Sequence, residues 1–384
     1  MCVCAHKDES VLSPRGSAFD MFCCLRVCEC VINTITQSFS YLFATMQRRV
    51  ATLARLPILG GTEAFNRLQA ALPAKCSVEN YAAYSSVLKG IVTDPSLMSV
   101  PLDDHGFHRG HCVFDTCNVE NGKAFGLSFH LERLFRSAQM AQILQEPPAP
   151  AFREEIKSAI LQTIAATKRK DEVFVRYWLS AGRGDFAVSP KNCSGPTFYC
   201  VAHKDSHSAT EPRGLKAATV DVPLKPPLLA TLKSNNYLLN ALVAMEADKR
   251  GGASIGVQFD AEGYLGESAV STIAIVDANG VLKAPPAEAI LPSTTWMRIV
   301  ALSDGLIEKG LLTACSQEVV HASELIGCRE MFTLGGGWIE PIVAFDDKSV
   351  GDGAPGPVFR ALDTLVRDDF LNPDLTDDIP YDDA

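Results

Sequence analysis

A hairpin signal near the middle of the chain constrains the fold more than any other feature. Two runs of alternating apolar and polar residues, CVFDTCNVE and KAFGLS, flank Asn121-Gly122, a dipeptide that strongly favours a two-residue hairpin turn. A helical stripe of apolar residues follows at once over 131–138. Other strand-like and helical segments come before and after, with no visible repeat. The pattern predicts a fold that mixes strands and helices.

Composition narrows the class of protein. The chain has 384 residues, 47% of them hydrophobic, which is enough to bury a sizeable core in two or three domains. Its formal net charge of −10 argues against nucleic acid, since phosphate contacts need clustered Lys and Arg. No uncharged apolar run reaches the length of a membrane span, so we expect none.

The thirteen cysteines do not suggest a disulfide scaffold, because a chain of this size has its own core. Six of them lie in the first thirty residues. We expect free thiols in a reducing compartment. The spacing of Cys24, Cys28 and Cys30 lacks a nearby His or a second Cys pair, so we predict no metal site.

The N-terminal region, 1–75, differs in composition and is predicted to be an extension outside the fold. Residues 1–55 contain Ser, Thr and Arg with few acids after Glu29, as in an organelle transit segment. A transit segment would direct the protein to a plastid or another organelle, and without one we expect a cytoplasmic protein. The rest divides into a small α/β domain (76–203), a polar linker (204–214), a larger domain (215–369) and an acidic, solvated tail (370–384).

Lys233 is the first candidate for chemistry. It stands before Ser-Asn-Asn, where a helix is expected to begin near Asn236. The positive end of a helix dipole disfavours a cation and lowers an amine pKa, which suits Schiff-base chemistry. Alone, the residue is better explained as a surface lysine whose stem covers apolar area.

Three other features gain meaning beside Lys233. Arg133 lies off the apolar stripe of its helix, and a guanidinium matches the geometry of a phosphate. Glu267 enters a strand after a Gly-rich turn, where a carboxylate can hold a protonated pyridine nitrogen. Pro292 and Ser293 precede a helix beginning at Thr294 and Thr295, whose free N–H groups form a phosphate site. Each has an ordinary structural explanation: a solvated face, a strand edge and a helix cap.

The order of these motifs from about 81 to 369 resembles the class IV aminotransferases. The resemblance rests on RGHCVFDT (109–116), HLERLFRSA (130–138), KSNNYLLN (233–240), the glycine-to-Glu267 strand and the ILPSTT helix start. Two segments, DDHGFHRGHCVFDT and RYWLSAGRGDF, most resemble the plant-type branch of the family. This branch holds D-amino-acid transaminases and 4-amino-4-deoxychorismate lyases beside branched-chain relatives. The family's α+β fold has two domains, a small N-terminal α/β domain and a larger one with a pseudo-barrel of strands.

The resemblance implies a role for each residue. Lys233 would bind pyridoxal 5′-phosphate covalently and move the substrate proton. Cofactor contacts are implied for Arg133, Tyr237, Glu267, Thr294, Thr295 and Gly336, and substrate contacts for Phe114 and Arg183. The family also implies a homodimer with an amino acid and a 2-oxo acid as substrates.

The sequence departs from the family pattern in four places. Cys112 and Ser293 stand where Gly is usual, Ser268-Ala269-Val270-Ser271-Thr272 replaces a Gly-Ser-Ser-Ser-Asn run, and Leu334-Gly335-Gly336 replaces a hydroxyl-bearing segment. Three functions remain open: a transaminase for D-amino or branched-chain amino acids, which leads; a lyase releasing pyruvate and p-aminobenzoate; and a non-catalytic homologue.

Overall fold

The computed structural model describes residues 56–72, 81–171, 173–204 and 214–381. The chain divides into two compact units, 1–66 and 67–384. Helix α2 (Gly61–Ala70) begins in the first unit and ends in the second. The transit segment predicted over 1–55, and most of the linker predicted over 204–214, lie outside the described residues.

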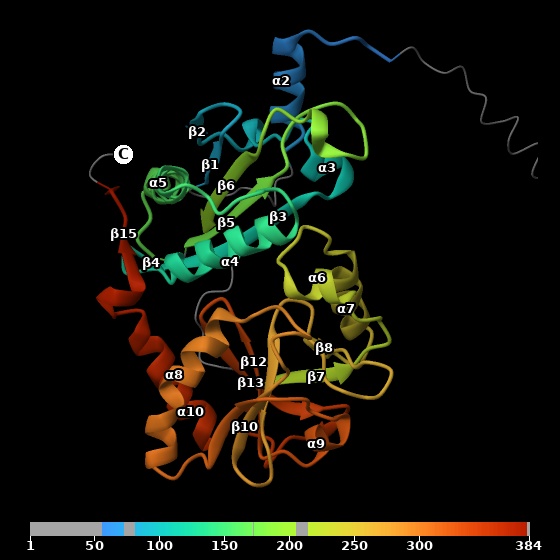
Figure 1. Ribbon diagram of the computed structural model, residues 1–384, viewed down its shortest axis with the longest axis vertical. Helices are drawn as coiled ribbons and strands as arrows, with labels where there is room; N and C mark the ends of the chain where they lie inside the picture. The colour runs from blue at the N-terminus through green and yellow to red at the C-terminus, as the bar shows by residue number, and fades with distance from the viewer. Residues whose placement is uncertain (1–55, 73–80, 172, 205–213, 382–384) are drawn as a thin grey trace, which may run out of the picture. The chain divides into compact units, whose positions relative to one another are not determined.

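The second unit contains two sheets. The first sheet has seven strands in the order β15-β4-β3-β5-β6-β1-β2 (Figure 1). Every neighbouring pair in it is antiparallel. The strands are β1 (Ala82–Ser85), β2 (Gly90–Val92), β3 (Cys112–Glu120), β4 (Lys123–Phe125), β5 (Val173–Ser180), β6 (Thr197–Lys204) and β15 (Thr376–Asp378). The predicted hairpin is confirmed, because β3 pairs with β4 around Asn121 and Gly122, both with positive φ.

Two helices cover one face of this sheet, α4 (Leu127–Met140) and α5 (Pro150–Ala166) (Figure 1). The apolar stripe of α4 is buried, as its spacing predicted, and packs with inward-facing residues of β3 and β5. The short helix α3 (His105–Arg109) precedes β3. The opposite face of β3 and β5 carries Phe114, Asn118 and Arg176, because side chains alternate along a strand.

The second sheet runs in the order β11-β10-β9-β12-β13-β7-β8, with β14 paired to β13. Its inner strand β9 (Thr272–Val276), between β10 and β12, is buried on both faces. Ile273 and Ile275 join one apolar cluster, while Ala274 and Val276 join another beneath two long helices. The remaining strands are β7 (Leu215–Thr219), β8 (Ile255–Val257), β10 (Val281–Ala284), β11 (Ala314–Gln317), β12 (Glu330–Gly335), β13 (Trp338–Phe345) and β14 (Lys348–Ser349).

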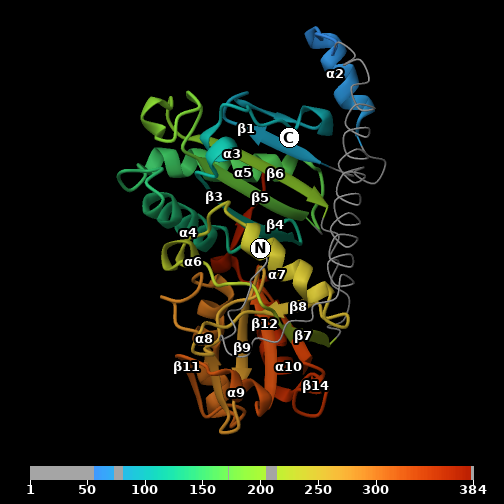
Figure 2. The ribbon, with the colours of Figure 1, turned by 90° about the vertical axis from the view of Figure 1, so that its right-hand side faces the viewer.

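The first sheet with α3, α4 and α5 is called the first lobe, and the second sheet with its helices is called the second lobe. The helices of the second lobe lie in three places (Figures 1 and 2). Two long helices, α8 (Thr294–Glu308) and α10 (Pro357–Asp369), pack on the cluster around Ala274 and Val276. The shorter α6 (Pro227–Thr231) and α7 (Leu238–Asp248) lie towards the first lobe, and α9 (Ala322–Ile326) lies at the far end of the sheet. The predicted α+β fold is thus confirmed, and its strands form two sheets.

The predicted solvated tail is wrong for its central part. Residues 376–378 form β15, which pairs with β4 at the edge of the first sheet. Ile379 is buried in the first core, and the Tyr381 hydroxyl donates to the Arg169 carbonyl at 2.6 Å. Acidic composition misled the prediction, because Asp377 and Asp378 make ion pairs with lysines of the first lobe. Within the described part of the chain, none of the helices combines the length and hydropathy needed to cross a membrane.

Candidate active site

The segment around Lys233 is held against the first lobe by backbone hydrogen bonds. Ser234 forms an antiparallel bridge with Val113 at the start of β3. Phe114 N–H donates to the Lys233 carbonyl at 2.9 Å, and Lys233 N–H donates to the Ser137 hydroxyl of α4 at 3.1 Å. A loop of the second lobe therefore pairs with a strand of the first, and Lys233 is fixed where the two meet.

The Lys233 ammonium group is buried at this junction. The side chain lies beside Phe114, with Nζ 4.7 Å from the ring centroid, and Nζ donates to the Tyr237 hydroxyl at 3.3 Å. Burial and then the nearby charge of Arg133 lower the pKa of Lys233 to about 8. The expected cause was a helix start, but α7 begins only at Leu238. Desolvation therefore replaces the helix dipole as the main reason for the shift.

Two aromatic rings flank the amine. The rings of Phe114 and Tyr237 meet edge to face, with centroids 4.9 Å apart. Burial, and then the charge of Glu267, raises the pKa of Tyr237, so the phenol stays protonated and can donate a hydrogen bond. Both residues were predicted from the sequence, and the structure brings both to Lys233.

Glu267 lies in an irregular segment before β9, not in a strand as predicted. Its Oε1 accepts from Leu291 N–H at 3.1 Å, and its Oε2 lies 3.8 Å from Lys225 Nζ. Burial raises the pKa of Glu267, against the opposing charges of Lys225, Lys233 and Arg133. A carboxylate in such a setting exchanges a proton more readily near neutral pH than an exposed one does.

Arg133 lies within a buried group of charged side chains. Its Nε and Nη2 donate to both oxygens of Asp115 at 2.8 Å, and its Nη1 donates to the Pro292 carbonyl at 3.1 Å. His130, three residues earlier on α4, contacts the same carboxylate at 3.1 Å. Burial alone would raise the pKa of Asp115, but Arg133 and His130 hold it well below its usual range. One Nη1 hydrogen has no partner in the described part of the chain, and it is available to an anion beside Pro292.

The start of α8 forms the other side of this anion position. Ser293 caps the helix by accepting from Trp296 N–H at 3.2 Å, so Ser in place of Gly does not block the first turn. No described residue accepts from the N–H groups of Thr294 and Thr295. Free N–H groups at a helix start favour a phosphate.

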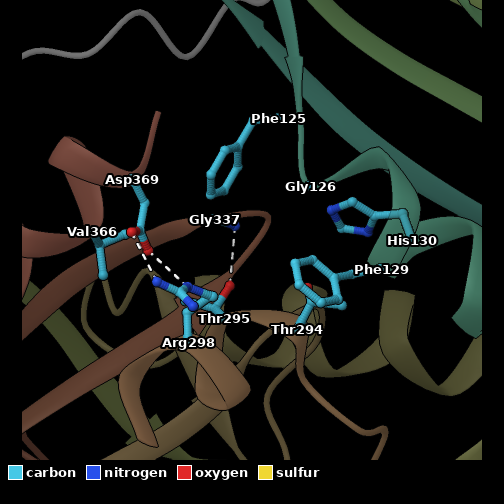
Figure 3. Close-up of a pocket in the computed structure, with 10 residues that line it drawn as sticks. All are labelled: Phe125, Gly126, Phe129, His130, Thr294, Thr295, Arg298, Gly337, Val366 and Asp369. Carbon is cyan, nitrogen blue, oxygen red and sulfur yellow. Dashed lines mark hydrogen bonds and ion pairs between the residues drawn. The ribbon is translucent and has the colours of Figure 1, made fainter. Parts of the chain in front are cut away.

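The turn between β12 and β13 reaches the same helix start. Gly336, with φ of 62°, is bound through its carbonyl to Asn118 Nδ2 of β3 at 2.6 Å. The next residue, Gly337, donates to the Thr295 hydroxyl at 3.0 Å. Figure 3 shows Thr294, Thr295, Gly337 and His130 around a small pocket, which Phe125 and Phe129 line from the first lobe. The glycines that replace the family's hydroxyl segment thus keep the turn close to α8.

Arg183 lies elsewhere. Its guanidinium forms a two-pronged ion pair with Asp103, at 2.9 and 2.8 Å. No contact within the described residues links it to Lys233 or Glu267. Another arginine, Arg176 of β5, stacks on Phe174 and Phe114, with distances of 5.3 and 5.9 Å to the ring centroids. It has no carboxylate partner among the described residues.

Sequence reasoning missed Asp115, His130, Arg176 and Lys225, and for two of them a signal existed. Asp115 stands between Val113 and Cys117 on the inward face of an alternating strand, where a lone acid needs a buried partner. Arg176 lies on the neighbouring strand β5, where the same alternation places its side chain on the opposite, outward face. Lys225 and His130 carried no such signal, since their partners come from distant segments.

The assembled groups fit pyridoxal 5′-phosphate. A buried amine with a lowered pKa suits covalent attachment, and Glu267 suits a ring nitrogen that carries a proton. The free N–H groups of α8 and the remaining Arg133 hydrogen suit a phosphate. Within the described part of the chain, no group of three or more His, Cys, Asp or Glu could hold a metal ion.

Comparisons with known proteins agree with this arrangement. The model of the amino-transferase class IV family matches residues 112–344. The D-amino-acid transaminase, chloroplastic, of Arabidopsis thaliana is 38% identical over 85% of this chain and 86% of its own length. The bifunctional aminodeoxychorismate lyase / D-amino acid transaminase of Mycobacterium tuberculosis is 31% identical over 54% of this chain and 74% of its own.

The fold also matches solved structures. The branched-chain amino acid aminotransferase of Escherichia coli aligns with a TM-score of 0.68, covering 78% of this chain and 99% of the other. At 22% identity this likeness bears on the fold alone.

Proposed function

The chain belongs to the class IV aminotransferases, and from this membership we propose that it transfers amino groups between D-amino acids and 2-oxo acids. Family membership makes it a pyridoxal-phosphate-dependent transaminase. The choice of D-amino acids follows the plant D-amino-acid transaminase that it resembles over most of its length.

The observation that carries the proposal is the buried Lys233 amine. Its pKa of about 8 leaves a usable neutral fraction near physiological pH, which an ordinary lysine lacks. The Tyr237 hydroxyl at 3.3 Å and the Phe114 ring fix its direction. We assign Lys233 the role of covalent anchor and proton carrier.

The other residues hold the cofactor and keep its charge in place. When bound, pyridoxal phosphate serves as an electron sink that makes the substrate's α-proton acidic. Glu267 would keep a proton at the ring nitrogen, and the protonated phenol of Tyr237 could donate a hydrogen bond to the cofactor. For the phosphate we propose Arg133, the N–H groups of Thr294 and Thr295, and the Gly336 turn, since these donors gather at the start of α8.

The substrate's carboxylate needs a cation near Lys233. We propose Arg176 for this role, because its guanidinium stacks on Phe114 and has no carboxylate partner within the described residues. Arg183 is a weaker candidate, since Asp103 already occupies both prongs of its guanidinium. Phe114 then separates the amine from the carboxylate-binding position.

The deciding experiment uses a panel of single D- and L-amino acids with a 2-oxo acid acceptor, and aminodeoxychorismate as a separate substrate. Formation of the new amino acid from D-donors, with L-donors at least ~100-fold slower, is the expected result. Faster turnover of L-donors contradicts the proposed stereochemistry. Release of pyruvate and p-aminobenzoate without transamination would make the chain a lyase, as one part of the Mycobacterium relative's name suggests.

Lys233→Ala is the matched control for this panel. It removes the amine but leaves the backbone hydrogen bonds that hold the segment against β3. We expect the visible absorbance of lysine-bound cofactor to vanish together with turnover. Persistence of both would exclude Lys233 as the anchor.

We also propose a plastid location, since the resembling Arabidopsis enzyme is described as chloroplastic and 1–55 has a transit-like composition. A homodimer is proposed from the family. We keep 76–203 and 215–369 as the two domains, with the strand Thr376–Asp378 returning to the sheet of the first.

A further inference from the structure

Lys225 is a second lysine beside the candidate site, and it is not one of the proposed cofactor or substrate contacts. It lies in the segment between β7 and α6, directly before Pro226 and Pro227. Its Nζ lies 3.8 Å from Glu267 Oε2 and 5.5 Å from the centroid of the Tyr237 ring. The two ion-pair side chains are only 11% and 13% exposed. In the described part of the chain, Glu267 has no other cation within ion-pair distance.

The other charges near Glu267 cannot replace Lys225. Arg133 is committed to Asp115 through two hydrogen bonds. Lys233 has a pKa of about 8, so part of its population is neutral near physiological pH. The Tyr237 phenol is neutral. Among the described residues, Lys225 is therefore the cation that faces Glu267 within ion-pair distance.

Glu267 is held from two sides. Leu291 N–H binds Oε1, while the Lys225 ammonium faces Oε2. Burial favours the protonated carboxylic acid, and Lys225 is the largest influence that opposes it. A protonated Glu267 can neither accept a hydrogen bond from a protonated ring nitrogen nor balance its charge, so loss of the lysine would weaken this role of the carboxylate.

We propose that Lys225 is a positioning residue, whose ammonium group keeps Glu267 a carboxylate and fixes its direction for the cofactor ring. The inference rests on the proposed function, because it assumes that Glu267 serves the ring nitrogen. Lys225 acts through Glu267 and contacts no reacting atom in this scheme.

The test compares Lys225→Met and Lys225→Arg in the holoenzyme, with Lys216→Met as the control. Lys216 lies exposed on β7, a few residues upstream. Four quantities are measured from about pH 6 to about pH 9: the Kd for pyridoxal phosphate, kcat, KM and the melting temperature. The Kd provides a readout that does not depend on turnover.

For Lys225→Met we expect the cofactor Kd near neutral pH to rise on the order of tenfold, the change that one unit in the pKa of Glu267 produces. The deficit should shrink as the pH rises, because Glu267 then loses its proton in both proteins. kcat should fall more than KM changes. Lys225→Arg should restore most of the affinity, and Lys216→Met should behave as the unaltered chain.

Two outcomes overturn the inference. One is a Lys225→Met protein with unchanged Kd and pH dependence. The other is an equal loss in both Lys225 variants with a lowered melting temperature and no pH dependence, which would show a purely structural lysine. Failure of the unaltered chain to bind pyridoxal phosphate would instead refute the proposed function, so the two failures are distinguishable.

Discussion

At the scale of single residues, the site is a set of charges taken out of water and neutralised pairwise. Asp115 offsets Arg133, with His130 in contact with the same carboxylate, and Lys225 offsets Glu267. Lys233, unlike these residues, has no carboxylate partner within ion-pair distance in the described part of the chain. A buried charge without such a partner costs free energy unless it is given up, and this cost makes the amine reactive.

The cost can be measured as a change in stability with pH. The pKa of Lys233 is about 8 in the folded chain against an ordinary 10.5, so folding works against its charge. The penalty is complete below about pH 8 and fades as the pH rises towards the ordinary value. Lys233→Met should therefore raise the unfolding free energy of the cofactor-free chain at pH 7 by up to about 3 kcal/mol.

Urea denaturation at several pH values checks this prediction. The gain should diminish above about pH 8. Lys216→Met, at an exposed position, serves as the control and should change little. A substitution that destabilises the chain at pH 7, or has the same effect at every pH, would refute the account of Lys233.

At the scale of elements, the sequence predicted the helices, strands and turns that depend on interactions between residues close together in the chain. The hairpin at Asn121-Gly122 and the helix starting at Thr294 need only turn chemistry and capping, and both are found. The pairing of Ser234 with Val113 has no local signal, since it joins segments more than a hundred residues apart. The same holds for β15. Its acidic composition predicts a solvated tail, and only the pairing with β4 shows that it is a strand.

The role of the C-terminal strand can be tested through Ile379. Its side chain is 7% exposed and belongs to the first core, whereas Leu371 is 69% exposed. Ile379→Ala should lower the unfolding free energy by about 2 to 4 kcal/mol, because it leaves a cavity at the sheet edge. Leu371→Ala, the matched control, should cost under about 0.5 kcal/mol in the same denaturation experiment. Equal effects of the two would mean that the C-terminal segment is not packed as described.

At the scale of the whole molecule, the cofactor position depends on both lobes. Arg133 comes from α4 of the first lobe, while Lys233, Glu267 and Thr294 come from the second. Motif order predicted these residues through family resemblance, and most of them do meet. Arg183 does not. A motif predicts the position of a residue along the chain but not its ion-pair partner, which for Arg183 is Asp103.

The proposed homodimer also belongs to this scale. Phe107 and Phe186, more than 60% exposed, lie on adjoining segments, since Arg109 Nη2 donates to the Phe186 carbonyl at 2.6 Å. Neighbouring exposed aromatic side chains are typical of contact surfaces. Light scattering of the full chain should give the mass of two chains, and Phe186→Asp should shift it towards one. Leu371→Asp, also exposed, should leave the mass unchanged; a monomer at all concentrations would refute the homodimer.

The pairing of β15 with β4 has a consequence for how the chain is made. The ion pair between Lys123 and Asp378 joins residues 255 positions apart. A ribosome releases the early strands of the first sheet long before β15, so the edge of β4 stays open until β15 has been translated. Contacts this distant in sequence form slowly. The first sheet is therefore completed only after β15 has emerged, and until then the edge of β4 can pair with another strand.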